Sequence, residues 1–490
     1  MKRIYKLANI YLVCFLIFPI FSYSESINKV LINFDVPEEY EENSGGNGTV
    51  KVSNKNSYSL PMKNLRSDQK IDFLIGNGLF KREWLPAPSI KASSDGLGPF
   101  FNATSCQGCH IKDGRGHPPD LTLEFDDSIS MVFHLSIPPQ NENDKQLLDT
   151  YRVKSINDPM YGGQLSDFAI EDLLSEGQIH INYEYIPIVF DNGTVVTLSK
   201  PIYSIKNLNY GNLHSDIQIS ARVAQPMIGL GLIQSISQND ILANEDINDD
   251  NNDTVSGVAN IVWDYDLNKT NIGLFGWKAA QPSIRQQSAD AFHNDMGLSS
   301  KHYPNGSNCS DKQIECNRYE HGNSPNIDDF ELSSNQLDLI EFYSSHLAVP
   351  ARRNHNNEKV LAGKKIFYES GCTSCHTPKF ITAKTNYSSA LSEQLIWPYS
   401  DFLLHDMGDG LADDSRAFKA SGREWRTQPL WGIGLTEEVN GHTKFLHDGR
   451  ANSLIEAILW HGGEAEKSKQ EILSLSVEEV ENLIKFIESL

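Results

Sequence analysis

The stretch Cys372-Thr373-Ser374-Cys375-His376 decides how this sequence is read, and Cys106-Gln107-Gly108-Cys109-His110 repeats its pattern. Two cysteines that are separated by two residues and followed directly by histidine are typical of covalent haem c attachment. The two thiols add to vinyl groups on one edge of the porphyrin, and the histidine then becomes the proximal iron ligand. The sequence therefore predicts two covalently bound haem c groups. Their predicted attachment residues are Cys106, Cys109, Cys372 and Cys375, and their predicted proximal ligands are His110 and His376.

Two other uses of paired cysteines fit the sequence less well. A zinc ribbon places its two cysteine pairs within about 20 residues of each other, whereas Cys109 and Cys372 are far apart. A thioredoxin-like redox motif needs one such pair in a βαβ context and no histidine after it. The histidine that follows each pair here favours haem.

The N-terminus has the pattern of an export signal. Lys2, Arg3 and Lys6 precede an apolar run over residues 7–21, and small residues follow at 22–24. This pattern predicts that residues 1–24 are a signal peptide and that the mature protein lies in the periplasm. No later run is apolar enough to cross a bilayer, so we expect no membrane span after signal removal.

The chain is strongly acidic. Its formal net charge is −22, and removal of residues 1–24 takes away three positive charges and no acid, which leaves −25. Such a charge argues against nucleic acid as a partner. It suits a periplasmic electron-donor protein with a basic face, because long-range attraction speeds encounter. Solubility alone is the other explanation of the charge.

Cys309 and Cys316 are left over once the haem motifs and the signal peptide are set aside. In an exported protein the pair predicts a disulfide. A redox-active dithiol is the alternative, but neither a CxxC spacing nor a helix start supports it.

The periodicity of the chain predicts helices interrupted by one β-rich stretch. Residues 131–137 alternate between apolar and polar as a half-buried strand does, with His134 on the outer, solvent-exposed face. Alternation on both sides of Asp191-Asn192-Gly193 predicts a hairpin over residues 179–198. Ser334 is a candidate cap for a helix that Pro350 ends, and Ser476 with Glu479 forms a capping box for the last helix.

These elements predict a mainly α fold with two cytochrome c-like haem domains, the first of which carries a large β-containing insertion. Residues 25–59 are expected to be a flexible tether, residues 60–352 the N-terminal haem domain and residues 353–490 the C-terminal haem domain. In the second domain, Gly363 would permit close approach of the first and last helices.

An Asp/Asn run offers a candidate calcium site. Asp249, Asn251 and Asp253 alternate as the oxygen ligands of calcium loops do. No glycine follows Asp253 and no glutamate closes the loop, so an EF-hand fits poorly and a plain polar turn is the alternative.

The sequence from about residue 60 to the C-terminus resembles the bacterial di-haem oxidoreductases described as peroxidases, which also go under the name of thiol oxidoreductases. The motifs that carry the resemblance are Tyr161-Gly162-Gly163-Gln164, Phe275-Gly276-Trp277-Lys278, Trp425-Arg426-Thr427-Gln428, Leu446-His447-Asp448-Gly449-Arg450 and Trp460-His461-Gly462-Gly463. The second half is also distantly similar to the di-haem cytochrome c peroxidases. Those enzymes carry a ligating methionine where this sequence has Leu446, and leucine cannot bind iron.

This resemblance implies that one haem stores an electron while the other keeps an open iron site. With Leu446 excluded, Met407 is the candidate sixth ligand of the second haem, and Met296 is the candidate for the first; apolar packing is the alternative for both. His447 and His405 are the candidate proton-transfer residues, and His461 lies close to them in sequence. A structural role, such as a hydrogen bond to a propionate or to the backbone, is the alternative for each of the three. Arg426 and Arg450 are expected to bind haem propionates. Trp431 and Trp277 are the candidates to lie between the haems; ordinary packing is the alternative for a buried tryptophan.

Two functions from different classes follow. The first is a peroxidase-like oxidoreductase that takes electrons from a donor protein and passes them to a small oxidant such as hydrogen peroxide. The second is a non-catalytic periplasmic electron-transfer cytochrome. Oxidation of a protein side chain is a third possibility. An open iron site would separate the enzyme from the carrier.

Overall fold

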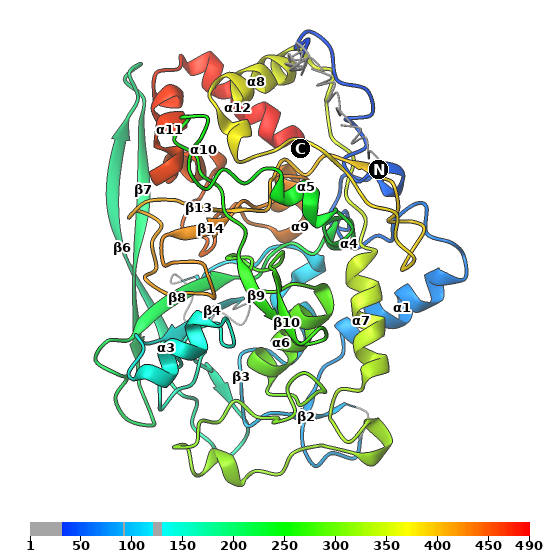
Figure 1. The fold of residues 1–490 in the computed structure, drawn as a ribbon, viewed down its shortest axis with the longest axis vertical. Helices are drawn as coiled ribbons and strands as arrows, with labels where there is room; N and C mark the ends of the chain where they lie inside the picture. The colour runs from blue at the N-terminus through cyan, green and yellow to red at the C-terminus, as the bar shows by residue number, and fades with distance from the viewer. Residues whose placement is uncertain (1–31, 92–93, 121–129) are drawn as a thin grey trace, which may run out of the picture. The chain divides into compact units, whose positions relative to one another are not determined.

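Helices and short strand pairs alternate along the chain (Figure 1). The structure is a computed structural model that describes residues 32–91, 94–120 and 130–490. The helices are α1 (Gln69–Phe80), α2 (Cys106–Cys109), α3 (Glu142–Asp149), α4 (Leu230–Gln234), α5 (Gln238–Leu242), α6 (Ile284–Met296), α7 (Ser334–Ser345), α8 (Glu358–Glu369), α9 (Thr436–Asn440), α10 (Leu454–Leu459), α11 (Glu466–Leu473) and α12 (Val477–Ser489). The strands are β1 (Leu85–Pro86), β2 (Asp95–Leu97), β3 (Phe100–Phe101), β4 (Met131–Ser136), β5 (Phe168–Ala169), β6 (Gln178–Val189), β7 (Val195–Lys206), β8 (Gln218–Val223), β9 (Ile261–Asp264), β10 (Lys269–Ile272), β11 (Phe380–Ile381), β12 (Leu395–Ile396), β13 (Leu404–Asp406) and β14 (Glu424–Arg426).

The prediction of a mainly α fold is wrong. The chain is 28% helix and 19% strand, and the strands of the described residues pair into small two-stranded sheets. Two of these pairs, β3 with β5 and β11 with β12, have only two residues per strand, which is too short for alternation to be recognised in the sequence. The two separate haem domains are not shown by the structure, and residues 34–490 form one compact unit. The boundary near residue 352 stays a prediction.

The predicted hairpin is confirmed and is the longest strand pair described. Strands β6 and β7 pair antiparallel over twelve residues each, from Gln178 opposite Lys206 to Val189 opposite Val195. Gly193 takes φ +86° in the turn, a conformation that glycine adopts without strain. The hairpin tip lies on the C-terminal part of the chain, because Asp191 N donates to Leu473 O (3.0 Å).

The predicted strand over residues 131–137 is also confirmed. Strand β4 pairs antiparallel with β8. One face of this ribbon, with Met131, Phe133 and Leu135, is buried in an apolar cluster shared with α8, α10 and α12. The opposite face of β4 was expected to meet solvent, and that expectation is wrong.

Helices α8 and α12 cross closely, as Figure 1 shows. A Cβ atom on Gly363 of α8 would lie 1.9 Å from the carbonyl oxygen of Asn482 on α12, so only glycine permits this contact. The capping box of α12 is confirmed, with Ser476 and Glu479 each bonded to the other's backbone. The cap of α7 is Ser333 and not Ser334, which is the first helical residue.

The segment before α1 packs against the C-terminal part of the chain. The Tyr58 hydroxyl, buried with 1% of the residue exposed, donates to Gly432 O (2.5 Å). Lys364 Nζ on α8 contacts Glu38 Oε1 at 2.9 Å. The predicted signal peptide, residues 1–24, lies outside the described residues. Within the described ranges, no helix is long and apolar enough to cross a membrane.

The remaining cysteine prediction is confirmed. Cys309 and Cys316 form a disulfide with their Cα atoms 5.8 Å apart. Cys316 is buried and begins a short 3-10 helix, Cys316–Arg318, which the sequence did not predict.

Candidate functional site

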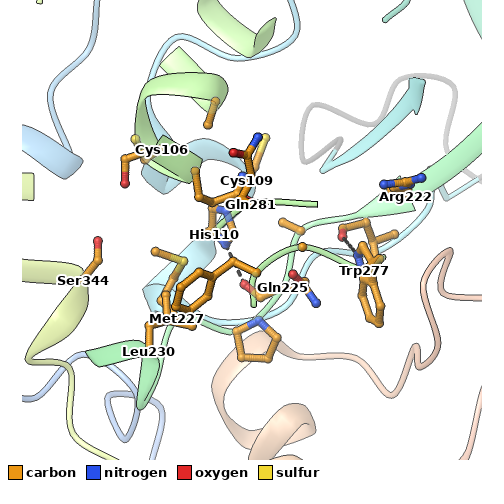
Figure 2. A pocket seen from close by; sticks show the side chains of 18 of the residues that line it. Cys106, Cys109, His110, Arg222, Gln225, Met227, Leu230, Trp277, Gln281 and Ser344 are labelled. Atoms are coloured by element: carbon orange, nitrogen blue, oxygen red, sulfur yellow. Dashed lines mark hydrogen bonds between the residues drawn. The ribbon is translucent and has the colours of Figure 1, made fainter. Parts of the chain in front are cut away.

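The first CxxCH motif opens on a cavity of about 270 Å³, here called cavity 1 and defined by Cys106, Cys109 and His110 (Figure 2). The two cysteines lie at the ends of α2, three residues apart, so their free thiols share one side of a single helical turn. His110 Nδ1 lies 2.7 Å from Gln225 O. This hydrogen bond makes Nδ1 the protonated nitrogen and leaves a lone pair on Nε2. Burial lowers the pKa of His110, which keeps the ring neutral.

The second motif opens on a cavity of about 200 Å³, here called cavity 2 and defined by Cys372, Cys375 and His376. The short 3-10 helix Cys372–Ser374 follows Gly371, whose φ of +79° lets the chain turn sharply out of α8. His376 Nδ1 lies 2.8 Å from Tyr399 O. Burial, with a smaller effect of the neighbouring His461, lowers the pKa of His376 to about 4. Both predicted proximal histidines thus offer a neutral Nε2.

The two cavities share one wall. Six residues line both of them, namely Arg115, Trp277, Arg426, Gln428, Leu430 and Ile433. Arg115 Nη1 donates to Leu446 O (2.9 Å), and Arg426 donates to Leu274 O and Gln428 Oε1. Arg426 Nε has no partner, and no described carboxylate pairs with either guanidinium. Burial lowers the pKa of Arg115 to about 10 and that of Arg426 to about 9.

These two arginines test whether the cavities fit haem. A buried guanidinium without a counter-charge is costly, so an anion is expected beside it. A haem carries two propionate carboxylates, which match the guanidinium fork. Each cavity also has an apolar lining, a neutral histidine Nε2 and two free thiols. The residues present therefore fit one haem per cavity, and Arg115 and Arg426 would be able to bind its propionates. Arg450, the other expected propionate partner, already binds Asp448 (Nε to Oδ2, 2.7 Å).

The shared wall continues into an aromatic stack. Trp277 lines both cavities, and its Nε1 donates to Val223 O (2.8 Å). Its ring lies edge-on to His447 at 6.5 Å, and His447 stacks on Trp425 at 3.7 Å. Trp431, the other tryptophan considered from sequence, lines only cavity 1 of the two. Trp277 is therefore the tryptophan that lies between the cavities.

The predicted proton-transfer residues His447 and His405 both line cavity 2, and their surroundings differ. Burial lowers the pKa of His447 to about 3, so its ring is neutral. His405 Nε2 lies 2.8 Å from Asp401 Oδ2, and Nδ1 lies 2.7 Å from Glu464 Oε2. Burial alone would lower the pKa of His405, but Cys375 and Asp401 raise it well above the usual value. Because both nitrogens of His405 are occupied, it cannot ligate iron without losing a carboxylate.

The predicted sixth ligands reach the expected cavities. Met296 ends α6, is buried with 2% of the residue exposed, and lines cavity 1. Met407 lines cavity 2 and packs against the apolar cluster around it. Ligation by either methionine stays a prediction.

In the candidate calcium loop, the side-chain oxygens accept hydrogen bonds from backbone amides of the same loop. Asp249 Oδ1 accepts from Thr254 N (3.1 Å), Asn251 Oδ1 from Asp253 N (2.8 Å), and Asp253 Oδ1 from Val255 N (2.9 Å). In the parts of the chain that the structure describes, no group of three or more His, Cys, Asp or Glu side chains could hold a metal ion. Calcium at this loop stays a prediction.

Sequence reasoning missed the polar lining of cavity 1. His134 was expected to face solvent, yet Val132 and His134 on that face of β4 line cavity 1, as do Ser130 just before the strand and Arg222 of β8. Figure 2 shows Arg222 at the same end of the cavity as Trp277. Lys154 also lines it. The alternation correctly identified a polar face, but not that the face meets a cavity.

Some polar atoms on this lining have no hydrogen-bond partner among the described residues. His134 Nδ1 is buried without a partner, and burial holds the pKa of His134 well below its usual value. Lys154 has no hydrogen-bonding or ion-pair partner for its Nζ among the described residues, and burial lowers its pKa. Asp295, whose Oδ1 accepts from Gln164 Nε2 (2.8 Å), lies on the same lining. Cavity 1 thus holds a cation, an acid and a neutral histidine in one buried space.

Comparison with known proteins identifies the family of this chain and gives distant structural matches. The family model described as "Di-haem oxidoreductase, putative peroxidase" matches residues 39–490. No curated protein matches the chain. A chain of the solved hydrazine synthase from Kuenenia stuttgartiensis is similar at 12% identity, covering 72% of this chain and 89% of that chain, with a TM-score of 0.26. A TM-score this low does not show that the two chains share a fold.

Proposed function

Because this chain belongs to the di-haem oxidoreductase family, we propose that it is an exported, peroxidase-like enzyme with one haem c in each cavity. Cys106 and Cys109 hold one haem and Cys372 and Cys375 the other, with His110 and His376 beneath the irons. When bound, the haems supply one-electron redox chemistry and an open iron position for an oxidant. The observation that carries the proposal is the pair of buried, carboxylate-free arginines on the wall shared by the two CxxCH cavities.

We assign the reactive position to cavity 1. Reduction of hydrogen peroxide to two waters takes two electrons and two protons, so a peroxidase site needs groups that hold and move protons. Lys154 and His134 both line cavity 1, and His134 Nδ1 is buried without a partner among the described residues. In cavity 2 both nitrogens of His405 are bound by carboxylates, and His447 is stacked on Trp425. Cavity 2 therefore suits electron storage.

Electrons would enter at cavity 2 from a periplasmic donor protein and reach cavity 1 through the shared wall. Trp277 is the residue whose ring lines both cavities, and its Nε1 bond to Val223 O fixes the ring. The acidic chain favours a donor with a basic docking face. The predicted signal peptide supports export, which haem c maturation in the periplasm also needs.

The test begins with protein made in a periplasm that attaches haem. Mass spectrometry is expected to find two added haem masses, and the EPR spectrum of the oxidised protein one high-spin haem. Two low-spin haems in every redox state would make the protein a carrier without catalysis. A chain without haem, or with zinc at the cysteines, would overturn the proposal.

Lys154→Met tests the assignment of cavity 1. Loss of a general acid costs about 10²–10⁴-fold in rate, so peroxide turnover is expected to fall by that order while haem content and spectrum stay unchanged. The matched control is Lys145→Met, because Lys145 lies on α3 with 56% of its side chain exposed. Equal turnover in both variants would remove Lys154 from the site.

A further inference from the structure

His461 has the same hydrogen-bond arrangement as the two predicted proximal histidines. Its Nδ1 lies 2.8 Å from Ala457 O, just as His110 Nδ1 lies 2.7 Å from Gln225 O and His376 Nδ1 2.8 Å from Tyr399 O. A carbonyl can only accept, so Nδ1 must carry the proton and Nε2 the lone pair. An imidazole held in this way has its orientation and tautomer fixed for binding a metal.

The free nitrogen of His461 lies on cavity 2. His461 follows α10 and lines the same cavity as His376, Cys372 and Cys375. No hydrogen bond to Nε2 is made by any residue of the described ranges. His461 is half-buried and lines the cavity, so its Nε2 is available to a ligand that occupies the cavity.

None of the other candidate donors on cavity 2 has the carbonyl-bound Nδ1 and the free Nε2 of His461. Both ring nitrogens of His405 lie within 2.8 Å of carboxylate oxygens. His447 stacks face to face on Trp425, and its Nε2 lies 3.5 Å from Asp448 Oδ2. Met407 packs with the apolar cluster, and an apolar contact satisfies a thioether that makes no iron bond.

We propose that Nε2 of His461 is the sixth ligand of the iron held by His376, so that this haem has two histidine ligands. The proposal rests on the proposed function, because it needs a haem in cavity 2. Bis-histidine ligation gives a lower potential than histidine–methionine ligation. The electron store of this enzyme would then be a low-potential one, and its donor must be a low-potential electron carrier.

The experiment compares oxidised full-length holoprotein of the wild type, His461→Ala and Met407→Leu by EPR and near-infrared spectroscopy. The wild type is expected to have one bis-histidine low-spin haem and no methionine–iron charge-transfer band. In His461→Ala that haem becomes high-spin, and added imidazole returns it to low-spin by filling the space of the lost ring. Met407→Leu is expected to keep the wild-type spectrum.

A methionine–iron band in the wild type that disappears in Met407→Leu would overturn the proposal and make Met407 the ligand. Unchanged low-spin content in His461→Ala would overturn it as well. If the alanine variant does not fold, His461→Met gives a second measurement. A new methionine–iron band and a raised midpoint potential would support ligation by residue 461. An unchanged spectrum would refute ligation by His461. Absence of haem from the wild type would instead refute the proposed function.

Discussion

Trp425 and His447 lie face to face, with their ring centroids 3.7 Å apart and their planes 14° apart. Trp277 meets the other side of this pair edge-on, at 6.5 Å from His447. Lys278 Nζ lies 4.4 Å from the Trp425 ring centroid and 2.8 Å from Asp413 Oδ1. A cation over an aromatic face stabilises the neutral ring and opposes its oxidation. The stack therefore suits electron transfer between the cavities better than storage of an oxidised tryptophan.

Replacement of Trp277 tests this path. Trp277→Phe removes the Nε1 bond to Val223 O and part of the ring that lines both cavities. Electron transfer from cavity 2 to cavity 1 is expected to slow by about tenfold, equivalent to about 1.4 kcal/mol in the barrier, while both haem spectra stay unchanged. Stopped-flow mixing of the reduced protein with peroxide measures the rate. Trp263→Phe is the control, because Trp263 lines neither cavity, and equal rates in both variants would exclude Trp277 from the path.

Arg426 is expected to set haem potential through its charge. Arg426→Gln removes a buried cation from the shared wall. Because a nearby positive charge favours the reduced, less positive iron, the midpoint potential of at least one haem is expected to fall. A spectroscopic redox titration measures the shift. Arg423→Gln is the control, since 43% of the Arg423 side chain is exposed. Unmoved potentials in Arg426→Gln would mean that no haem propionate lies beside this residue.

Sequence alone identified what is encoded locally. A CxxCH motif, a capping box at Ser476 and a hairpin around Gly193 each depend on residues close together in the chain, so their patterns could be read directly. The tautomer of His110 and His376 could not be predicted, because it depends on carbonyls contributed by Gln225 and Tyr399. Only packing brings those carbonyls to the rings.

The features that the sequence predicted wrongly depend on contacts between segments far apart in the chain. His134 lies on the polar face of β4, and a polar face is ordinarily expected to meet solvent. Here β8, α6 and Lys154 enclose that face in cavity 1. The prediction of the fold class was wrong for a similar reason. Strands of two or three residues, such as β11 and β13, form only when a distant partner pairs with them.

The crossing of α8 and α12 predicts a steric effect at Gly363. In Gly363→Ala the new Cβ would lie 1.9 Å from Asn482 O and 2.8 Å from Phe486 Cβ, so the helices must separate. Overpacking of this kind costs about 1–3 kcal/mol, and the midpoint of chemical denaturation should fall accordingly. Gly78→Ala on α1 is the matched control, because its Cβ would meet nothing within 4 Å. That variant is expected to be stabilised by about 0.5–1 kcal/mol.

A buried carboxyl near β5 predicts a pH dependence of stability. Burial raises the pKa of Asp167 to about 7, from its ordinary value of 3.8, and its Oδ1 has no partner in the structure. The folded state therefore binds this proton more tightly than the unfolded state. The resulting stabilisation is complete below about pH 4 and is lost as the pH rises through about 7.

Asp167→Asn removes this titration. The variant is expected to be more stable than the wild type at pH 8, on the order of 2 kcal/mol, and nearly equal to it at acid pH, where the wild-type carboxyl is already neutral. Denaturant unfolding at both pH values measures the difference. Asp172→Asn, at an exposed position nearby, should leave the pH profile unchanged. A stability difference between Asp167→Asn and the wild type that is the same at both pH values would mean that folding does not raise the pKa of Asp167, with water or a cation supplying the partner that its Oδ1 lacks.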